Sequence, residues 1–268
     1  MLVAFAPVRL SVHNYKKTSA MTGGGLFAIC DERLPLSYSD KLHDRGFSVI
    51  RLPASGAHQA IASHTDIILF RHRSTLIGSA EYFSDKESLA NKIRAAGFDL
   101  RLSDAVIGEK YPRDAIFNAL VIGEYLFCRT ATVSRDILSY ANEAGLKVVN
   151  TNQGYPACTV LPIGDRLAIT SDKGMAAALE SVGITAILTD ESEKISLPPY
   201  KNGFIGGCAG ALGKTLCFIG DPSVLPYFDR LKECINEAGF TYYALGEPNS
   251  GLLDLGGIIL SDNRGDES

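Results

Sequence analysis

A five-fold cadence dominates this chain: a segment with the apolar spacing of a helix, then a glycine, then a short apolar segment typical of a strand. The five glycines are Gly46, Gly97, Gly145, Gly183 and Gly239, and they recur at intervals of roughly 40–55 residues. A glycine at this place fits the left-handed residue that ends a helix, where a Cβ would clash. The pattern predicts one supersecondary unit repeated along or around an axis.

The segments before these glycines carry further helix signals. Ser84 begins a capping box with Glu87, and Ser134 is a second candidate cap. Apolar residues follow at helical spacing in both segments, and again in the runs that begin at Ser171 and Pro226. We therefore predict an amphipathic helix before each repeating glycine.

A second pattern precedes each helix, in which a tight turn separates two apolar segments. Residues 120–126, 161–167 and 210–216 share it, and residues 67–77 have the same form. Such a pattern predicts an antiparallel hairpin. A doubly wound parallel sheet is the usual fold for alternating strands and helices, but it does not predict a hairpin inside every unit. The repeating unit is therefore strand, turn, strand, helix, glycine, strand.

Four complete units lie near residues 64–103, 113–150, 157–190 and 205–246. The fifth is divided: its opening strand is expected near residues 252–260, and its helix and closing strand within residues 23–53. A divided unit is what closure of a ring produces, because the two ends of the chain then meet and no sheet edge stays open. We predict one domain over residues 1–268.

Five such units in a ring, with one shared between the termini, resemble the pentein fold. This five-bladed, pseudo-symmetric α/β-propeller belongs to the guanidino-group-modifying enzymes: arginine and agmatine deiminases, dimethylargininases and amidinotransferases. The resemblance covers about residues 23–260 and rests mainly on the repeat pattern. Its best local match is residues 111–118, Tyr-Pro-Arg-Asp-Ala-Ile-Phe-Asn. The chain resembles a branch distinct from the named enzymes of this superfamily.

The resemblance implies that the Asp of the Arg113-Asp114 pair receives a guanidinium group. A planar guanidinium presents paired N–H donors, and a carboxylate accepts two of them. Asp66 and Asp254 also stand at unit starts, where their carboxylates would converge on the ring axis. The predicted ligand-binding residues are Asp66, Arg113, Asp114, Asn118, Cys158 and Asp254.

In these enzymes a Cys thiolate attacks the guanidinium carbon and a His moves protons. The His follows the Arg-Asp segment, and the Cys comes shortly after a Gly-Gly pair near the C-terminus. Here the last histidine is His72, and Gly256-Gly257 is followed by Ile258. The standard catalytic Cys and His are therefore absent from those positions.

Two cysteines and one histidine remain candidates for a rearranged catalytic set. Cys208 lies in a glycine-rich segment, Cys158 lies at a unit start, and His64 precedes Asp66 by two residues. A catalytic set of Cys208, His64 and Asp114 would act on a guanidino C–N bond.

Three hypotheses of function follow. The first is a protein that binds a small cationic ligand, of guanidino or amine type, in an axial pocket lined by carboxylates. The second is a Cys-dependent hydrolase or amidinotransferase with the rearranged set. The third is an interaction protein with no small-molecule site, because a fold does not fix a function.

Composition and charge argue against several classes of partner and cofactor. The formal net charge of −4 gives no broad attraction to nucleic acid or anionic lipid. The six cysteines lack CxxC spacing, so we expect no metal site of that type, and we expect no cofactor. No stretch approaches the ~20 apolar residues of a membrane span, and free cysteines fit the reducing cytoplasm. The sequence leaves open whether copies of the chain form a homo-oligomer.

Overall fold

The computed structural model describes residues 25–190 and 194–263. These residues form a mixed α/β fold with five three-stranded sheets of the same plan and one short two-stranded pairing. In each three-stranded sheet the central strand pairs antiparallel with one neighbour and parallel with the other. In the four continuous units the antiparallel pair is the predicted hairpin. In all five sheets a helix makes the crossover that the parallel pair requires.

Four of the sheets are built from consecutive segments. Their strands are β3 (Leu69–His72), β4 (Thr75–Ser79) and β5 (Asp99–Ser103); β6 (Leu120–Ile122), β7 (Tyr125–Cys128) and β8 (Lys147–Asn150); β9 (Val160–Ile163), β10 (Leu167–Thr170) and β11 (Thr185–Leu188); and β13 (Ala209–Leu212), β14 (Thr215–Phe218) and β15 (Thr241–Ala244).

The fifth sheet joins segments from opposite ends of the described chain. It consists of β17 (Ile259–Ser261), β1 (Leu26–Asp31) and β2 (Phe47–Leu52), in that order. Its strand β17 is shorter than the predicted segment 252–260. Residues Leu252–Leu253 instead form β16, which pairs with β12 (Ile195–Ser196).

The five longer helices are α1 (Leu36–Asp44), α4 (Glu87–Ala95), α5 (Arg135–Glu143), α7 (Lys173–Glu180) and α8 (Phe228–Glu237). Each of the five repeating glycines follows one of these helices and has a positive φ, between 68° and 89°. The glycines therefore end the helices as predicted, in a conformation that a Cβ disfavours. Shorter helical segments are α2 (Thr65–Ile68), α3 (Ala80–Phe83), α6 (Pro156–Thr159), η1 (Gly206–Cys208) and η2 (Pro222–Val224).

One predicted cap is present and one is wrong. The Ser134 hydroxyl accepts a hydrogen bond from the Asp136 backbone N–H, as expected at the start of α5. The Ser84 hydroxyl instead donates to the carbonyl of Glu81. Ser84 closes the short helix α3, so it is not available to cap α4, which begins at Glu87 without a side-chain cap.

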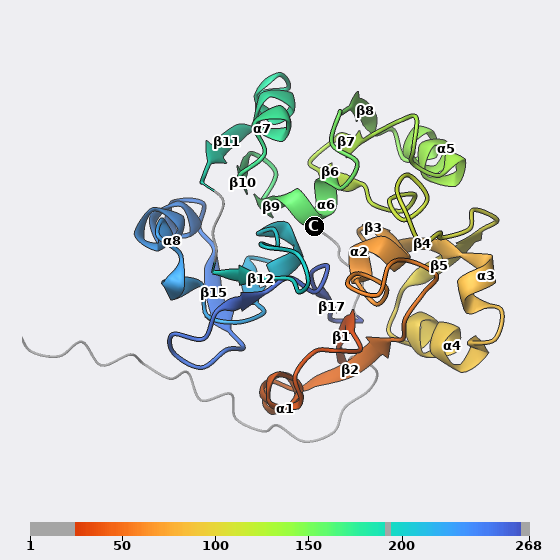
Figure 1. Ribbon diagram of the computed structural model, residues 1–268, viewed down its shortest axis with the longest axis horizontal. Coiled ribbons are helices and arrows are strands. Elements are labelled where there is room, and N and C mark those ends of the chain that lie inside the picture. The colour runs from red at the N-terminus through yellow and green to blue at the C-terminus, as the bar shows by residue number, and fades with distance from the viewer. Residues whose placement is uncertain (1–24, 191–193, 264–268) are drawn as a thin grey trace, which may run out of the picture.

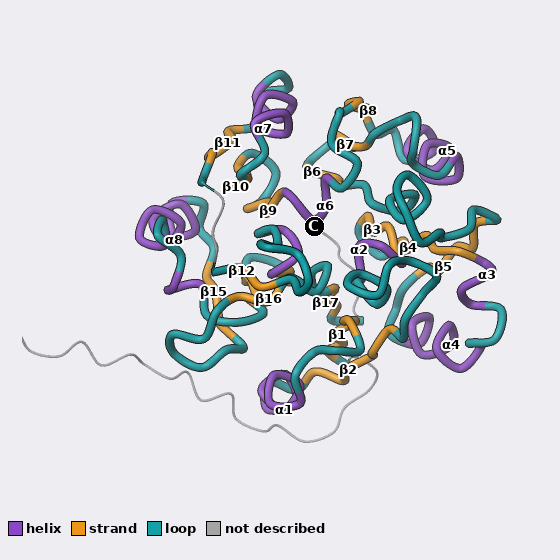
Figure 2. Tube along the Cα trace, viewed as in Figure 1, coloured by secondary structure: helices purple, strands orange, loops and turns teal. Residues whose placement is uncertain are grey.

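The five sheets lie around the middle of the molecule, with the five longer helices on the outside (Figure 1). The tube coloured by secondary structure shows the same division between outer helices and inner strands (Figure 2). We expected a ring in which no sheet edge stays open. The sheets are instead separate, and within the described residues no continuous ladder of strands joins them. Neighbouring units are linked by backbone hydrogen bonds outside the sheets, such as Asp66 N to Gly256 O (3.3 Å) and Gly257 N to Gly207 O (2.8 Å).

Buried apolar side chains form four clusters between the sheets and the helices. One of them packs Ala28 and Cys30 of β1 against Leu260 of β17 and Cys217 of β14. This packing brings both ends of the described chain into one core. Within the described ranges we find no helix with the length and apolar character needed to cross a bilayer.

Candidate functional site

The segments just before the innermost strands bring polar side chains to the middle of the molecule. Asp66 lies in α2 before β3, Asn118 precedes β6, and Cys158 lies in α6 before β9. Cys208 lies in η1 before β13, and Asp254 precedes β17. All five side chains are buried. The repeated plan therefore gives each unit one buried polar or sulfur-bearing side chain shortly before its innermost strand.

Three of these side chains form a continuous hydrogen-bonded chain across three units. The Cys158 Sγ donates to Asp66 Oδ2 at 2.6 Å, and Asn118 Nδ2 donates to Cys158 Sγ at 3.3 Å. The amide of Asn118 is oriented by its other end, since its Oδ1 accepts from the Ala157 N–H at 2.9 Å.

His64 lies between the two buried carboxylates of this centre. Its Nδ1 is 3.9 Å from Asp66 Oδ1 and 3.9 Å from Asp254 Oδ1. Neither ring nitrogen, nor Asp66 Oδ1, makes a hydrogen bond to the part of the chain that the structure describes. Asp254 is fixed by two backbone donors, Phe204 N at 2.8 Å and Gly256 N at 3.1 Å. We call His64, Asp66, Asn118, Cys158 and Asp254 the central group.

Burial shifts the protonation of the central group toward neutral forms. It raises the pKa of Asp66 to about 6 and, with repulsion from Asp66, that of Asp254 to about 7. It lowers the pKa of His64 to about 3. Burial and the neighbouring carboxylates raise the pKa of the Cys158 thiol well above its usual range. At neutral pH the thiol is protonated and the imidazole uncharged.

Two glycines let the backbone approach these carboxylates closely. A Cβ on Gly207 would collide with Asp254 Oδ1, and one on Gly256 would come within 2.5 Å of Asp66 Oδ1. Gly256 also has a φ of +69°, which other residues adopt only with strain. The Gly-Gly pair at 256–257 therefore shapes the site although no cysteine follows it.

An ion pair beside the central group was not predicted from the sequence. Asp31, fully buried at the end of β1, accepts from Arg33 Nε at 2.9 Å and from Nη2 at 2.5 Å. Arg33 also donates to the carbonyl of Ala60 at 2.9 Å. The charge of Arg33 acts on the pKa of both His64 and Asp254. Asp31 belongs to the divided unit, where comparison of the repeats gives no counterpart that would have identified it.

The predicted catalytic set of Cys208, His64 and Asp114 is not joined by hydrogen bonds among the described residues. The Cys208 Sγ donates to the carbonyl of Phe204 at 3.1 Å. Burial raises the pKa of Asp114, whose carboxylate lies beside the Tyr155 hydroxyl. Arg113 is exposed, and its carbonyl accepts from the Gly108 N–H.

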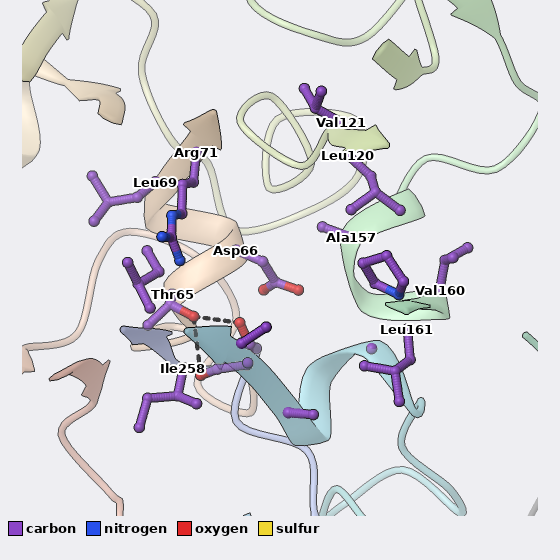
Figure 3. Close-up of a pocket in the computed structure, with 18 of the residues that line it drawn as sticks. Thr65, Asp66, Leu69, Arg71, Leu120, Val121, Ala157, Val160, Leu161 and Ile258 are labelled. Atoms are coloured by element: carbon purple, nitrogen blue, oxygen red, sulfur yellow. Dashed lines mark hydrogen bonds between the residues drawn. The ribbon is translucent and has the colours of Figure 1, made fainter. Parts of the chain in front are cut away.

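A cavity of about 410 Å³ adjoins the central group. Its lining includes Asp66, Arg71, Leu120, Leu161 and Ile258. The Asp66 carboxylate points from α2 into the space that faces Ala157 of α6 (Figure 3). Across the described ranges, no group of three or more His, Cys, Asp or Glu side chains has an arrangement that would hold a metal ion.

Comparison with known proteins gives a family and a fold. The model of a family described as "Family of unknown function (DUF6873)" matches residues 29–259. No curated protein sequence matches the chain.

Among solved structures, the ternary complex of AgrE with ornithine and NAD+ has a TM-score of 0.51 and 10% identity, over 91% of this chain and 40% of that one. An adduct of dimethylarginine dimethylaminohydrolase with S-methyl-L-thiocitrulline has a TM-score of 0.50 and 10% identity, over 82% of this chain and 91% of that one. At such identities the likeness shows the fold alone, and the fold is that of the pentein superfamily, as the resemblance in the sequence indicated.

Proposed function

The chain belongs to the DUF6873 family of unknown function, and we propose that it binds a small cationic ligand, of guanidino or amine type, at the buried carboxylate of Asp66, with the carboxylate of Asp254 nearby. The observation that carries the proposal is the buried oxygen Asp66 Oδ1. It makes no hydrogen bond to the described residues, and Asp66 is one of the residues that line the cavity. A buried acceptor without a partner costs free energy that a bound N–H donor recovers.

The electrostatics favour a cation in particular. Burial raises the pKa of both Asp66 and Asp254, and the charge of Asp66 raises the pKa of Asp254 further. A bound cation stabilises both ionised carboxylates and reverses part of this rise. A guanidinium suits the site best, because its planar N–H donors match carboxylate geometry.

We also propose how the five sheets are arranged in the fold. The five three-stranded sheets act as blades of one pseudo-symmetric propeller, with one blade divided between the chain ends and a single domain over residues 1–268. The equivalent positions of Asp66, Asn118, Cys158, Cys208 and Asp254 before the innermost strands support this arrangement. A ligand on the propeller axis would meet one side chain from each blade.

The neighbours suggest which ligands to test first. One is an adduct with S-methyl-L-thiocitrulline and another a complex with ornithine. For this chain we propose a ligand of the same general size, with Asn118 and Cys158 as further contacts. Asp114 and Arg113 stay predicted contacts at the edge of the site.

Calorimetric titration of the full chain with guanidine, agmatine, arginine and butylamine tests the proposal. We expect at least one of these cations to bind, and the Asp66→Asn and Asp254→Asn variants to lose tenfold or more in affinity. Asp40→Asn, on the exposed face of α1, is the matched control and should bind as the unmodified protein does. Absence of binding by every cation, or unchanged affinity in both central variants, would refute the proposal.

The contact between Cys158 and Asp66 supports a second candidate function, cleavage of a guanidino C–N bond. A guanidinium in the site would favour the thiolate, and Asp66 Oδ2, 2.6 Å from Sγ, would accept the thiol proton. The sulfur would then form a bond to the guanidinium carbon. Asp66 would return the proton to the departing nitrogen, which leaves as ammonia or an amine, and water would release the carbon product from sulfur.

Ammonia release from the same guanidino compounds tests this second function. Cys158→Ser should abolish turnover, whereas Cys208→Ser should retain it, because the Cys208 thiol is hydrogen-bonded to a backbone carbonyl and not to a carboxylate. No turnover by the unmodified protein with any ligand that binds would leave a binding protein and exclude this chemistry for those compounds.

A further inference from the structure

The cavity beside the central group extends along the axis for the length of the innermost strands. Thr65 and Asp66 line it at one end, where α2 leads into β3. Arg73 and Gly213 line it at the other end, in the hairpin turns that follow β3 and β13. We call this cavity the axial pocket. Its volume of about 410 Å³ is within the range of sites that bind small molecules.

The two ends of the axial pocket carry opposite charge. Of the described residues that line it, the acidic one is Asp66, at the inner end. The basic ones, Arg71, His72 and Arg73, all come from the turn end of the same hairpin. Burial lowers the pKa of His72, so the positive charge at neutral pH comes from the two arginines.

The wall between these ends is apolar. Its side chains include Leu120, Leu161, Leu216 and Ile258. The Thr65 hydroxyl donates to the carbonyls of Gly256 and Gly257. Among the described residues, the lining has no polar side chain other than Thr65 and those of the charged ends. A charged group halfway along the pocket would therefore be desolvated without a partner.

The Asp66 carboxylate and the Arg71 guanidinium hold fixed positions. The Asp66 carboxylate is 8% exposed and points into the pocket (Figure 3). Arg71 donates from Nη2 to the carbonyl of Leu260 at 3.0 Å and from Nε to that of Arg73 at 3.2 Å. From the rise per residue of α2 and β3, the Cα atoms of Asp66 and Arg71 are roughly 10 Å apart.

We infer that the ligand is an unbranched ω-guanidino or ω-amino carboxylic acid that lies along the axial pocket. This inference rests on the proposed function and names its ligand class. The cationic end binds Asp66, the hydrocarbon chain packs on the apolar wall, and the carboxylate meets the charges of Arg71 and Arg73. An α-amino acid such as arginine fits less well, because its α-ammonium group would lie near the arginines and the apolar wall.

Four probes with the same cationic head separate the possibilities: γ-guanidinobutyrate, butylguanidine, agmatine and arginine. They differ only in the far end, which is anionic, uncharged, cationic or zwitterionic. In calorimetric titrations of the full chain we expect γ-guanidinobutyrate to bind at least tenfold more tightly than butylguanidine or agmatine.

Variants locate the two ends of the ligand. Arg73→Gln, at an exposed turn position, should weaken γ-guanidinobutyrate about fivefold and leave butylguanidine unchanged. Asp66→Asn should weaken both compounds tenfold or more. Arg166→Gln, in the corresponding turn between β9 and β10 and outside the pocket lining, is the matched control and should change neither.

The outcomes distinguish this inference from the proposal on which it rests. Equal affinities for γ-guanidinobutyrate and butylguanidine, both still dependent on Asp66, would overturn the inference and leave the cation site intact. An unchanged affinity of Arg73→Gln and Arg71→Met for γ-guanidinobutyrate would have the same meaning. Failure of all four probes to bind would overturn both.

Discussion

Asp66, Asp254 and His64 lie within one buried group, and their titration should govern how the protein responds to pH. The two carboxyls keep their protons to about pH 6 and about pH 7, whereas His64 is uncharged above about pH 3. The carboxyls therefore change charge near neutrality and the imidazole does not.

Cation binding should tighten as the pH rises from about 5 to about 7 and then level off. A bound cation favours the ionised carboxylates, so binding releases protons that the free protein holds in this range. Each released proton changes the dissociation constant by up to about tenfold per pH unit. Calorimetry in buffers of different ionisation enthalpy measures the release directly. A dissociation constant that does not change with pH would contradict the assigned contact.

Folding stability should decrease over part of the same range. Between about pH 4 and 7 the folded protein holds the Asp254 proton that the unfolded chain has released, so stability falls as the pH rises. His64 acts in the opposite sense between about pH 3 and 6.5, because its pKa is lowered on folding. The carboxyls outweigh it, and the net fall from pH 5 to 8 is about 2 kcal/mol.

Urea unfolding of Asp254→Asn at about pH 5 and 8 isolates this effect. The variant should lose the fall in unfolding free energy, whereas the exposed Asp40→Asn should keep it. The substitution also alters the hydrogen bonds from Phe204 and Gly256, which changes the unfolding free energy at both pH values. Comparing the change in unfolding free energy between the two pH values removes this cost. If the unfolding free energy of the variant falls with pH as steeply as that of the unmodified protein, the pKa of Asp254 is not raised on folding.

At the scale of single elements, the helices follow local rules that the sequence shows directly. The five glycines adopt positive φ and follow the longer helices. The caps depend on where the preceding segment ends, because a serine that closes one turn is not available to start the next. Ser134 caps α5 for this reason and Ser84 does not cap α4.

Ser134→Ala should lower the free energy of unfolding by about 1 kcal/mol, the usual cost of a lost N-cap. Ser84→Ala should cost much less, because its hydroxyl makes only an exposed bond to the Glu81 carbonyl. The midpoints of urea unfolding curves measure both losses of unfolding free energy. Equal losses in the two variants would mean that the assigned cap of α5 contributes no more than a surface bond.

At the scale of the whole molecule, the divided sheet makes stability near the N-terminal strands depend on residues near the other end. Leu260 of β17 is fully buried, and its neighbour in the ladder is Ala28 of β1. The strands of this sheet come from sequence positions far apart, so their pairing forms only when the chain closes on itself.

Leu260→Ala should cost about 2–5 kcal/mol, the range for a buried leucine. Leu102→Ala, at a position in β5 that is 47% exposed, is the matched control and should cost far less. Amide hydrogen exchange should accelerate within Phe27, Ala28 and Ile29, the β1 residues that pair with β17. Unchanged exchange at these amides would show that β1 is stable without its C-terminal partner.

Sequence patterns alone predict the elements and their order. The hairpins, the crossover helices, the glycine ends and the division of one unit all follow from local spacing, because apolar period and turn chemistry act over a few residues. The sequence also selected His64, Asp66, Asn118, Cys158 and Asp254 as site candidates, since each stands near the start of a unit.

The contacts among these candidate residues follow from the packing of the units and could not be predicted from the sequence. Cys158, and not Cys208, lies against Asp66, because contacts between units depend on how the innermost strands approach one another. The apolar wall of the axial pocket was hidden because its residues come from different units, and the Asp31–Arg33 pair was hidden because the other units offer no counterpart. Local sequence rules fix each unit, whereas burial, shifted pKa values and the pocket arise from packing between units that no single segment encodes.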